Sequence, residues 1–265
     1  MAISAVSLAP TRSAALPVAV TAIGRSTRVV LRSPVLLITP VAQSLFFLLV
    51  YAGQLSTVGS SYLAGGSVIS FLLPLILLTG VATGAGAAGT LVLGDVTSGY
   101  LDRLRLAHGT ASPFLIGAAV ASLVAVTSQT IITIAGAMLL GYRPESWSGV
   151  TAMTLLMLAL GLGIALLSIA VAIRTASAPS TNLVTLAVFG LSFFTGVFAP
   201  VDELAAWMRA IATFNPLTYV VDATRQLESN TAPSNLPIAA VVVATLVIAG
   251  IAACALALAH ARRNR

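Results

Sequence analysis

Long stretches of apolar residues without a charged side chain dominate the chain. Six of them approach or exceed the roughly 20 residues that a helix needs to cross the ~30 Å hydrocarbon layer of a bilayer. The stretches lie at about residues 35–51, 66–93, 113–140, 150–173, 182–199 and 236–259. We therefore predict an all-α membrane protein with six transmembrane helices, which form a single transmembrane domain over residues 35–265.

The 13 basic residues are all arginines, and they are distributed unevenly between the ends of the predicted spans. Ten precede the first span, follow the second or fourth span, or follow the last one, whereas only Arg143, Arg209 and Arg225 lie in the other connections. Because basic residues are enriched on the cytoplasmic side of membrane proteins, this bias places both termini in the cytoplasm. We predict a multi-pass protein of the cytoplasmic membrane, and the exclusive use of arginine suggests a bacterial source.

The composition excludes several classes of function. With 58% hydrophobic and only 8% charged residues, the chain is not a soluble enzyme. It has no lysine for the phosphate-binding loop of a Walker-type ATPase, so any ATP and Mg²⁺ must be bound by another chain. The net charge of +6 is explained by the arginines beside the spans, and we expect no binding of nucleic acid.

Candidate chemistry inside the predicted spans is sparse. Cys254 is the only cysteine and lies in an apolar stretch, so neither a disulfide nor a metal site is predicted. No Asp, Glu or His lies within a predicted span, which disfavours a proton-coupled transporter whose relay needs such a group. The serines lack a histidine at their depth, so no catalytic site and no cofactor in this chain are expected. The driving force should come from another subunit.

Residues 1–34 are expected to form a retained cytoplasmic segment with an amphipathic helix. Arg25, Arg28 and Arg32 fall within a narrow arc at helical spacing, and apolar residues lie broadly opposite to them. A helix of this kind lies in the interface between membrane and water. Two interpretations remain open: the helix contacts a cytoplasmic partner, or it only anchors the first span by its positive charge.

The connection after the second predicted span has the pattern of a short amphipathic helix. Tyr100, Leu101 and Leu104 recur at helical spacing, whereas Arg103 and Arg105 point in other directions. Such a helix could tie neighbouring spans together at the interface. It could equally insert into a groove on a cytoplasmic partner, as amphipathic helices commonly do.

The connection between the last two predicted spans, about residues 200–235, should carry two short helices on the outer side of the membrane. Trp207 begins an apolar stripe at helical spacing, which predicts a re-entrant helix or a helix lying on the outer membrane face. Asn215-Pro216 interrupts this stripe. Asp222 and Arg225 are three residues apart, so they can pair on one helical face.

These two connections carry motifs that resemble a known family. The first reads Gly-Tyr-Leu-Asp-Arg-Leu-Arg over residues 99–105. The second contains Gly-x-Phe-x-Pro, which ends at Pro200, and Asn-Pro-Leu-Thr-Tyr-x-x-Asp-x-x-Arg over residues 215–225. Together with six spans and two cytoplasmic ends, they resemble the permeases of type 2 ABC exporters, in particular the daunorubicin/doxorubicin-resistance branch. The chain departs from that branch after Arg105 and at Leu204-Ala205, where the branch commonly has Leu-Pro.

The resemblance implies the membrane subunit of an ATP-driven exporter of a lipophilic small molecule, drug, lipid or glycolipid. Two separate ATPase subunits would hydrolyse the ATP, and a second permease chain, identical or related, would complete the path. The residues that would face the ATPase are Arg25, Arg28, Arg32, Tyr100, Leu101, Arg103, Leu104 and Arg105. The outer structural motif would consist of Pro200, Trp207, Asn215, Pro216, Asp222 and Arg225.

By the same resemblance, the first, second and fifth spans would line the transport path. Membrane lipid would be a further partner of the chain. The polar candidates along it are Gln43, Ser44, Thr79, Thr83, Ser192 and Thr195. The alternative for each of them is a hydrogen bond within or between helices. A different hypothesis for the whole chain is a non-transporting membrane scaffold or assembly factor, which binds partner proteins through its outer connection.

Overall fold

The computed structural model describes residues 15–55, 67–108, 111–196, 203–229, 231–232 and 234–263. Within these ranges the chain is built of α-helices, with one short 3₁₀ turn and no strand. Ten α-helices follow one another in this part of the chain: α1 (Ala15–Arg32), α2 (Pro34–Leu55), α4 (Val68–Thr97), α5 (Tyr100–His108), α6 (Ser112–Leu139), α7 (Trp147–Thr175), α8 (Ala178–Ser192), α9 (Ala206–Phe214), α10 (Pro216–Glu228) and α11 (Leu236–Arg263).

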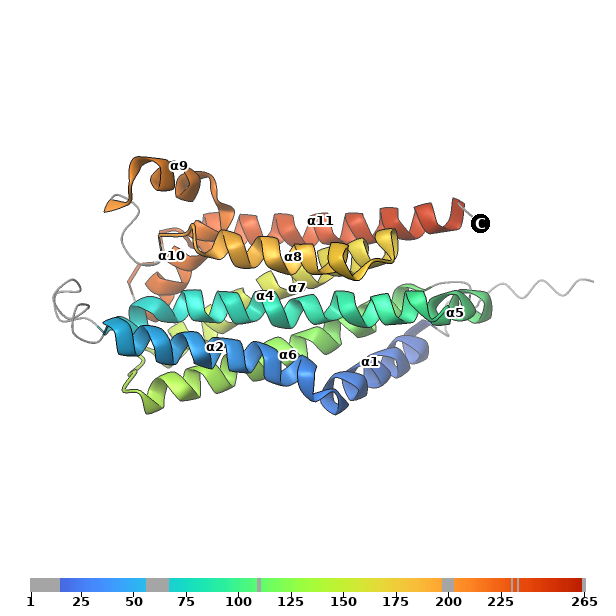
Figure 1. Cartoon of the computed structure of the whole chain (residues 1–265), viewed down its shortest axis with the longest axis horizontal. Helices are drawn as coiled ribbons and strands as arrows, with labels where there is room; N and C mark the ends of the chain where they lie inside the picture. Colours follow the sequence, from blue (N-terminus) through green and yellow to red (C-terminus); the bar gives the residue numbers. More distant parts are fainter. Residues whose placement is uncertain are drawn as a thin grey trace, which may run out of the picture.

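The long helices α2, α4, α6, α7, α8 and α11 run along one common direction (Figure 1). The short helices lie at the two ends of this bundle. α1 and α5 lie at the end that also holds the last turn of α11, and α9 and α10 lie at the opposite end (Figure 1). These are called the α1/α5 end and the α9/α10 end below.

Five helices are long and apolar enough to cross a membrane: α2, α4, α6, α7 and α11. The structure therefore confirms a helical chain with several candidate spans, but it differs from the expectation at the fifth predicted span, residues 182–199. There α8 begins earlier, at Ala178, and ends after 15 residues at Ser192. The residues after Ser192 turn, and Gly196 has a φ of 60°, a left-handed conformation that favours glycine. Apolar composition continues past the end of α8, which is why the sequence predicted a longer helix.

α4 lies in the middle of the bundle and packs against α2, α6, α7 and α8. Small residues allow these helices to approach each other. A Cβ atom on Gly84 would lie 3.2 Å from the Val126 side chain of α6, and one on Gly89 would lie 2.8 Å from the Ser168 Cβ of α7. Most of α4 is consequently buried. The helices around α4 expose apolar side chains on their outer faces instead.

Candidate functional site

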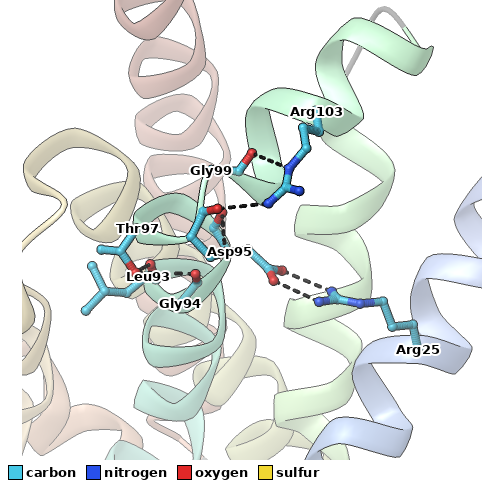
Figure 2. Close-up of polar contacts among 8 residues, drawn as sticks. Arg25, Leu93, Gly94, Asp95, Thr97, Gly99 and Arg103 are labelled. Carbon is cyan, nitrogen blue, oxygen red and sulfur yellow. Dashed lines mark hydrogen bonds and ion pairs between the residues drawn. The ribbon is translucent and has the colours of Figure 1, made fainter.

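An ion pair joins α1 to the end of α4. The Arg25 guanidinium donates two hydrogen bonds to the Asp95 carboxylate, at 2.8 and 3.0 Å (Figure 2). This parallel, bidentate geometry is the strongest form of arginine–carboxylate contact. The side chains are 38% and 22% exposed, so water screens the pair only in part. The α1 helix is thereby fixed in orientation beside the turn that leads into α5.

The same arginine also contacts an aromatic residue of α5. Its guanidinium carbon lies 4.3 Å from the centre of the Tyr100 ring, a cation–π contact. Tyr100 in turn meets Phe114 of α6 edge to face. Ala22 of α1 and Leu104 of α5 are buried against Phe114 in one small apolar cluster. The two short helices are thus held to α6 and to each other.

The amphipathic helix predicted after the second span is present as α5, and its apolar face points into this chain. Leu101 is 4% exposed and Leu104 is 9% exposed. These two predicted docking residues therefore pack within the subunit in this conformation. Leu106 of α5 is 87% exposed. Leu106 lies two residues after Leu104 and therefore off the apolar stripe, so the helical spacing did not indicate it as a docking residue.

The remaining predicted docking residues are arginines. Arg28 and Arg32 are exposed on α1, and Arg103 is exposed on α5. Arg103 also donates to the backbone oxygens of Ser98 and Gly99, at 3.1 and 3.4 Å, and so stabilises the turn between α4 and α5 (Figure 2). The side chain of Arg105 lies outside the described residues.

A groove with a volume of about 660 Å³ lies between α2 and α8, and residues of α4 also line it. Gln43 and Thr83 lie on its wall, and the Thr83 hydroxyl donates to the Gln43 side-chain oxygen at 2.8 Å. The other polar side chains on its wall were not selected from the sequence: Thr39, Thr90, Asn182 and Thr185. Asn182 and Thr185 are one turn apart on α8, and that spacing could have indicated their common face.

The other four predicted path residues do not line this groove. Ser44 and Thr79 are buried, and Gln129 of α6 donates to the Ser44 hydroxyl at 2.9 Å. Ser192 and Thr195 are buried and donate to backbone oxygens three residues earlier, at 2.6 and 2.7 Å. In this subunit these hydroxyls therefore make hydrogen bonds within or between helices.

Aromatic rings line the part of the groove nearer the α9/α10 end. Phe47 of α2 lies between α2 and α8, with its ring centre 6.1 Å from those of Phe189 and Phe193. On the other side Phe47 stacks on Tyr51 at 5.5 Å. Phe47 and Phe189 belong to the wall of the groove and make this end suited to flat, apolar molecules.

The outer motif holds the α9/α10 end together. Asn215 separates α9 from α10, as the sequence predicted, and its side-chain oxygen accepts from the Leu217 amide to cap α10, which begins at Pro216. Its amide group donates to the Leu191 and Phe194 backbone oxygens, at 2.7 and 3.2 Å. Asn215 therefore ties the two outer helices to the end of α8.

Arg225 makes a second tie at this end. It pairs with Asp222 at 3.6 Å, as their spacing predicted, and it also donates to the Phe71 and Gly196 backbone oxygens at 3.2 and 3.3 Å. Burial lowers the pKa of Arg225 and raises the pKa of Asp222. Trp207 is 62% exposed on α9. Pro200 lies outside the described residues.

Comparison with known proteins identifies this bundle. A family model for ABC-2 type transporters matches residues 19–229, which includes most of α1, all of α5, both sides of the groove and the outer motif. The chain belongs to the ABC-2 type transporter family. The ABC-2 chain is also 26% identical over 232 residues to the daunorubicin resistance ABC transporter permease protein DrrB1 of Streptomyces coeruleorubidus. The alignment covers 84% of this chain and 79% of that protein.

The family resemblance indicated by the two sequence motifs is therefore confirmed. An ABC-2 chain with five helices able to cross a membrane is a multi-pass membrane protein, and it is a transporter subunit. The α2/α8 groove and the pair of helices at the α1/α5 end are the candidate functional sites of this subunit.

Proposed function

We propose that this ABC-2 chain is the permease subunit of an ATP-driven exporter of lipophilic small molecules. The observation that carries the proposal is the groove between α2 and α8, which combines apolar and aromatic walls with a few hydrogen-bonding groups. Sites for drug-sized ligands have this composition. ATP and Mg²⁺ belong to two separate ATPase subunits in this account.

Export requires helices that cross the membrane, and it requires that these helices have a defined orientation. In the proposed exporter α8, with 15 residues, is the sixth membrane-crossing helix beside the five candidates of the structure. The arginine distribution places the α1/α5 end, with both termini, in the cytoplasm. The α9/α10 end then faces outward, and cargo leaves toward it.

A second permease chain closes the groove. Phe46 and Leu186 stand on the two sides of the groove and are 59% and 63% exposed. In a pair of subunits these apolar side chains face the partner, and the two grooves form one shared path. The partner is either a second copy of this chain or a related permease.

The ATPase subunits bind the α1/α5 end. The surface offered there consists of Arg28 and Arg32 on α1 and of Arg103 and Leu106 on α5, because Leu101 and Leu104 are buried. The Arg25–Asp95 pair joins α1 to the end of α4, and the Tyr100 contact joins α1 to α5. A displacement of α5 by the ATPase is therefore passed to α1 and to the start of α2.

Two leucines at opposite ends of the bundle provide the test of this docking surface. Leu106 at the α1/α5 end is 87% exposed, and Leu139 at the end of α6 is 89% exposed. The tagged chain is purified in mild detergent with its cellular partners, and bound ATPase is quantified by mass spectrometry. We expect Leu106→Asp to lower ATPase recovery about tenfold and Leu139→Asp to leave it unchanged. Equal recovery with both variants would remove Leu106 from the docking surface.

Failure to recover any ATPase with the unmodified chain, over repeated mild conditions, would contradict the exporter proposal and favour a scaffold. For transport itself, daunorubicin serves as the transport probe because the related permease carries that drug in its name. Its ATP-dependent movement into inside-out membrane vesicles measures export by this chain with its ATPase.

A further inference from the structure

A second groove lies between the last turns of α7 and α11, at the α1/α5 end. Its volume is about 550 Å³. Alanines form much of its wall, including Ala170 on α7 and Ala253 and Ala257 on α11. Arg174 and His260 lie at its rim. This groove is separate from the α2/α8 groove and shares no residue with it.

The groove results from a change in side-chain size along two packed helices. Nearer the middle of the bundle, Gly163 and Gly250 bring α7 and α11 together, since a Cβ on Gly250 would lie 2.6 Å from the Leu166 Cβ. Ala170 follows Gly163 by about two turns, roughly 10 Å along the helix. At the level of Ala170 the alanines are too small to fill the space between the two helices, and the apolar groove remains.

The surroundings of the groove are apolar on the outer face of the bundle. Ile248, Ile251 and Leu256 of α11 are 66%, 56% and 71% exposed. Leu256 also belongs to the wall of the groove. In a helix that is able to cross a membrane, this face meets lipid acyl chains. An acyl chain is therefore the molecule with direct access to the groove.

The rim is positively charged. Arg174 is exposed in the last turn of α7, and its side chain makes no hydrogen bond or ion pair to any residue in the described part of the chain. Phosphate is a preferred partner of arginine, and a basic residue at a membrane surface attracts anionic lipids.

We propose that this groove binds one anionic phospholipid from the leaflet on the α1/α5 side. One acyl chain lies along Ala170, Ala253 and Ala257, and the phosphate contacts Arg174. The proposal concerns the lipid-facing side of α7 and α11 and does not depend on the proposed transport path.

Native mass spectrometry of the purified chain tests this site with two lipids that carry the same acyl chains. Phosphatidylglycerol is the anionic probe, and phosphatidylcholine is the zwitterionic one. We expect the unmodified chain to retain one phosphatidylglycerol with at least about threefold preference. Arg174→Gln should abolish the preference while leaving the melting temperature unchanged, because the side chain is exposed. Arg143→Gln, at the opposite end of the bundle, is the matched control and should keep the preference.

A second variant tests the apolar part of the groove. Ala257→Phe fills the space between α7 and α11, so both lipids should be lost from the site. Three results would overturn the proposal: an unchanged preference in Arg174→Gln, the same loss in Arg143→Gln, or full lipid retention in Ala257→Phe. A change of oligomeric mass in Ala257→Phe without a change in bound lipid would also overturn it, because a second chain would then cover the groove.

Discussion

At the scale of single residues, the polar groups of the bundle fall into two classes that the sequence does not separate. Gln43 and Thr83 bond to each other on the wall of the α2/α8 groove. Ser44 is a few ångströms away along the chain, yet it bonds to Gln129 in the interior. All are uncharged polar residues in apolar stretches. Which of them faces a groove depends on the rotation of each helix about its axis, and packing against α4 and α6 sets that rotation.

Glu228 is a residue whose burial has a measurable consequence. It is 5% exposed near the α9/α10 end, with Tyr142 and Glu145 around it, and burial raises its pKa above the ordinary 4.5. The folded state then binds a proton that the unfolded state releases. Stability from this group is complete below pH 4.5 and is lost as the pH rises through the folded-state pKa.

Glu228→Gln should therefore raise the melting temperature at pH 8, because the neutral amide needs no proton to remain buried. Thermal unfolding in detergent, at pH 8 and near pH 4, measures the difference between the variant and the unmodified chain. A difference that is the same at both pH values would contradict the assigned role of Glu228.

At the scale of elements, α5 shows where sequence reasoning succeeds and where it stops. The spacing of Tyr100, Leu101 and Leu104 predicted a short amphipathic helix, and α5 is present. The same spacing did not show what covers its apolar face. Leu101 and Leu104 pack on other helices of this chain, and the ring of Phe114, which covers part of this face, comes from α6. An apolar stripe indicates that one face of a helix is buried. Only the tertiary arrangement shows which surface covers that face.

The attachment of α1 provides a prediction at this scale. α1 crosses α6 at Gly117, where an added Cβ would lie 2.8 Å from the backbone of Ala22. Gly117→Ala should therefore push α1 away from α6, because backbone atoms cannot move aside as a flexible side chain can. Trypsin cleavage after the exposed Arg28 in α1 should become several times faster in membrane-embedded protein.

Gly24→Ala, on α1 itself, is the matched control for Gly117→Ala on α6. An added Cβ there meets nothing within 4 Å. Alanine favours a helix over glycine by about 1 kcal/mol, so this variant should be cleaved at the original rate or more slowly. If the two alanine variants were cleaved at the same rate, the close packing of α1 on α6 would not hold α1 in place.

At the scale of the whole molecule, the apolar stretches predicted where the long helices lie but not the spaces between them. The predicted spans overlap α2, α4, α6, α7, α8 and α11. The groove, in contrast, is formed by residues up to 154 positions apart, from Val35 to Phe189. The periodicity of apolar residues within one helix does not show which residues of other helices lie beside it. The family motifs indicated which spans would line a path, and the groove between α2, α4 and α8 corresponds to those spans.

In the proposed exporter the α2/α8 groove carries the cargo, so ATP-dependent transport should depend on the side chains of its wall. Gln43→Ala combined with Thr83→Val removes the paired polar groups from the wall, whereas Ser192→Ala removes a hydroxyl that bonds only within its own helix. Loss of a hydrogen-bonding group costs about 1 kcal/mol, so the double variant should move the transport probe roughly three- to tenfold less efficiently. Ser192→Ala should match the unmodified chain. Unimpaired transport by the double variant, together with a defect in Ser192→Ala, would contradict the account.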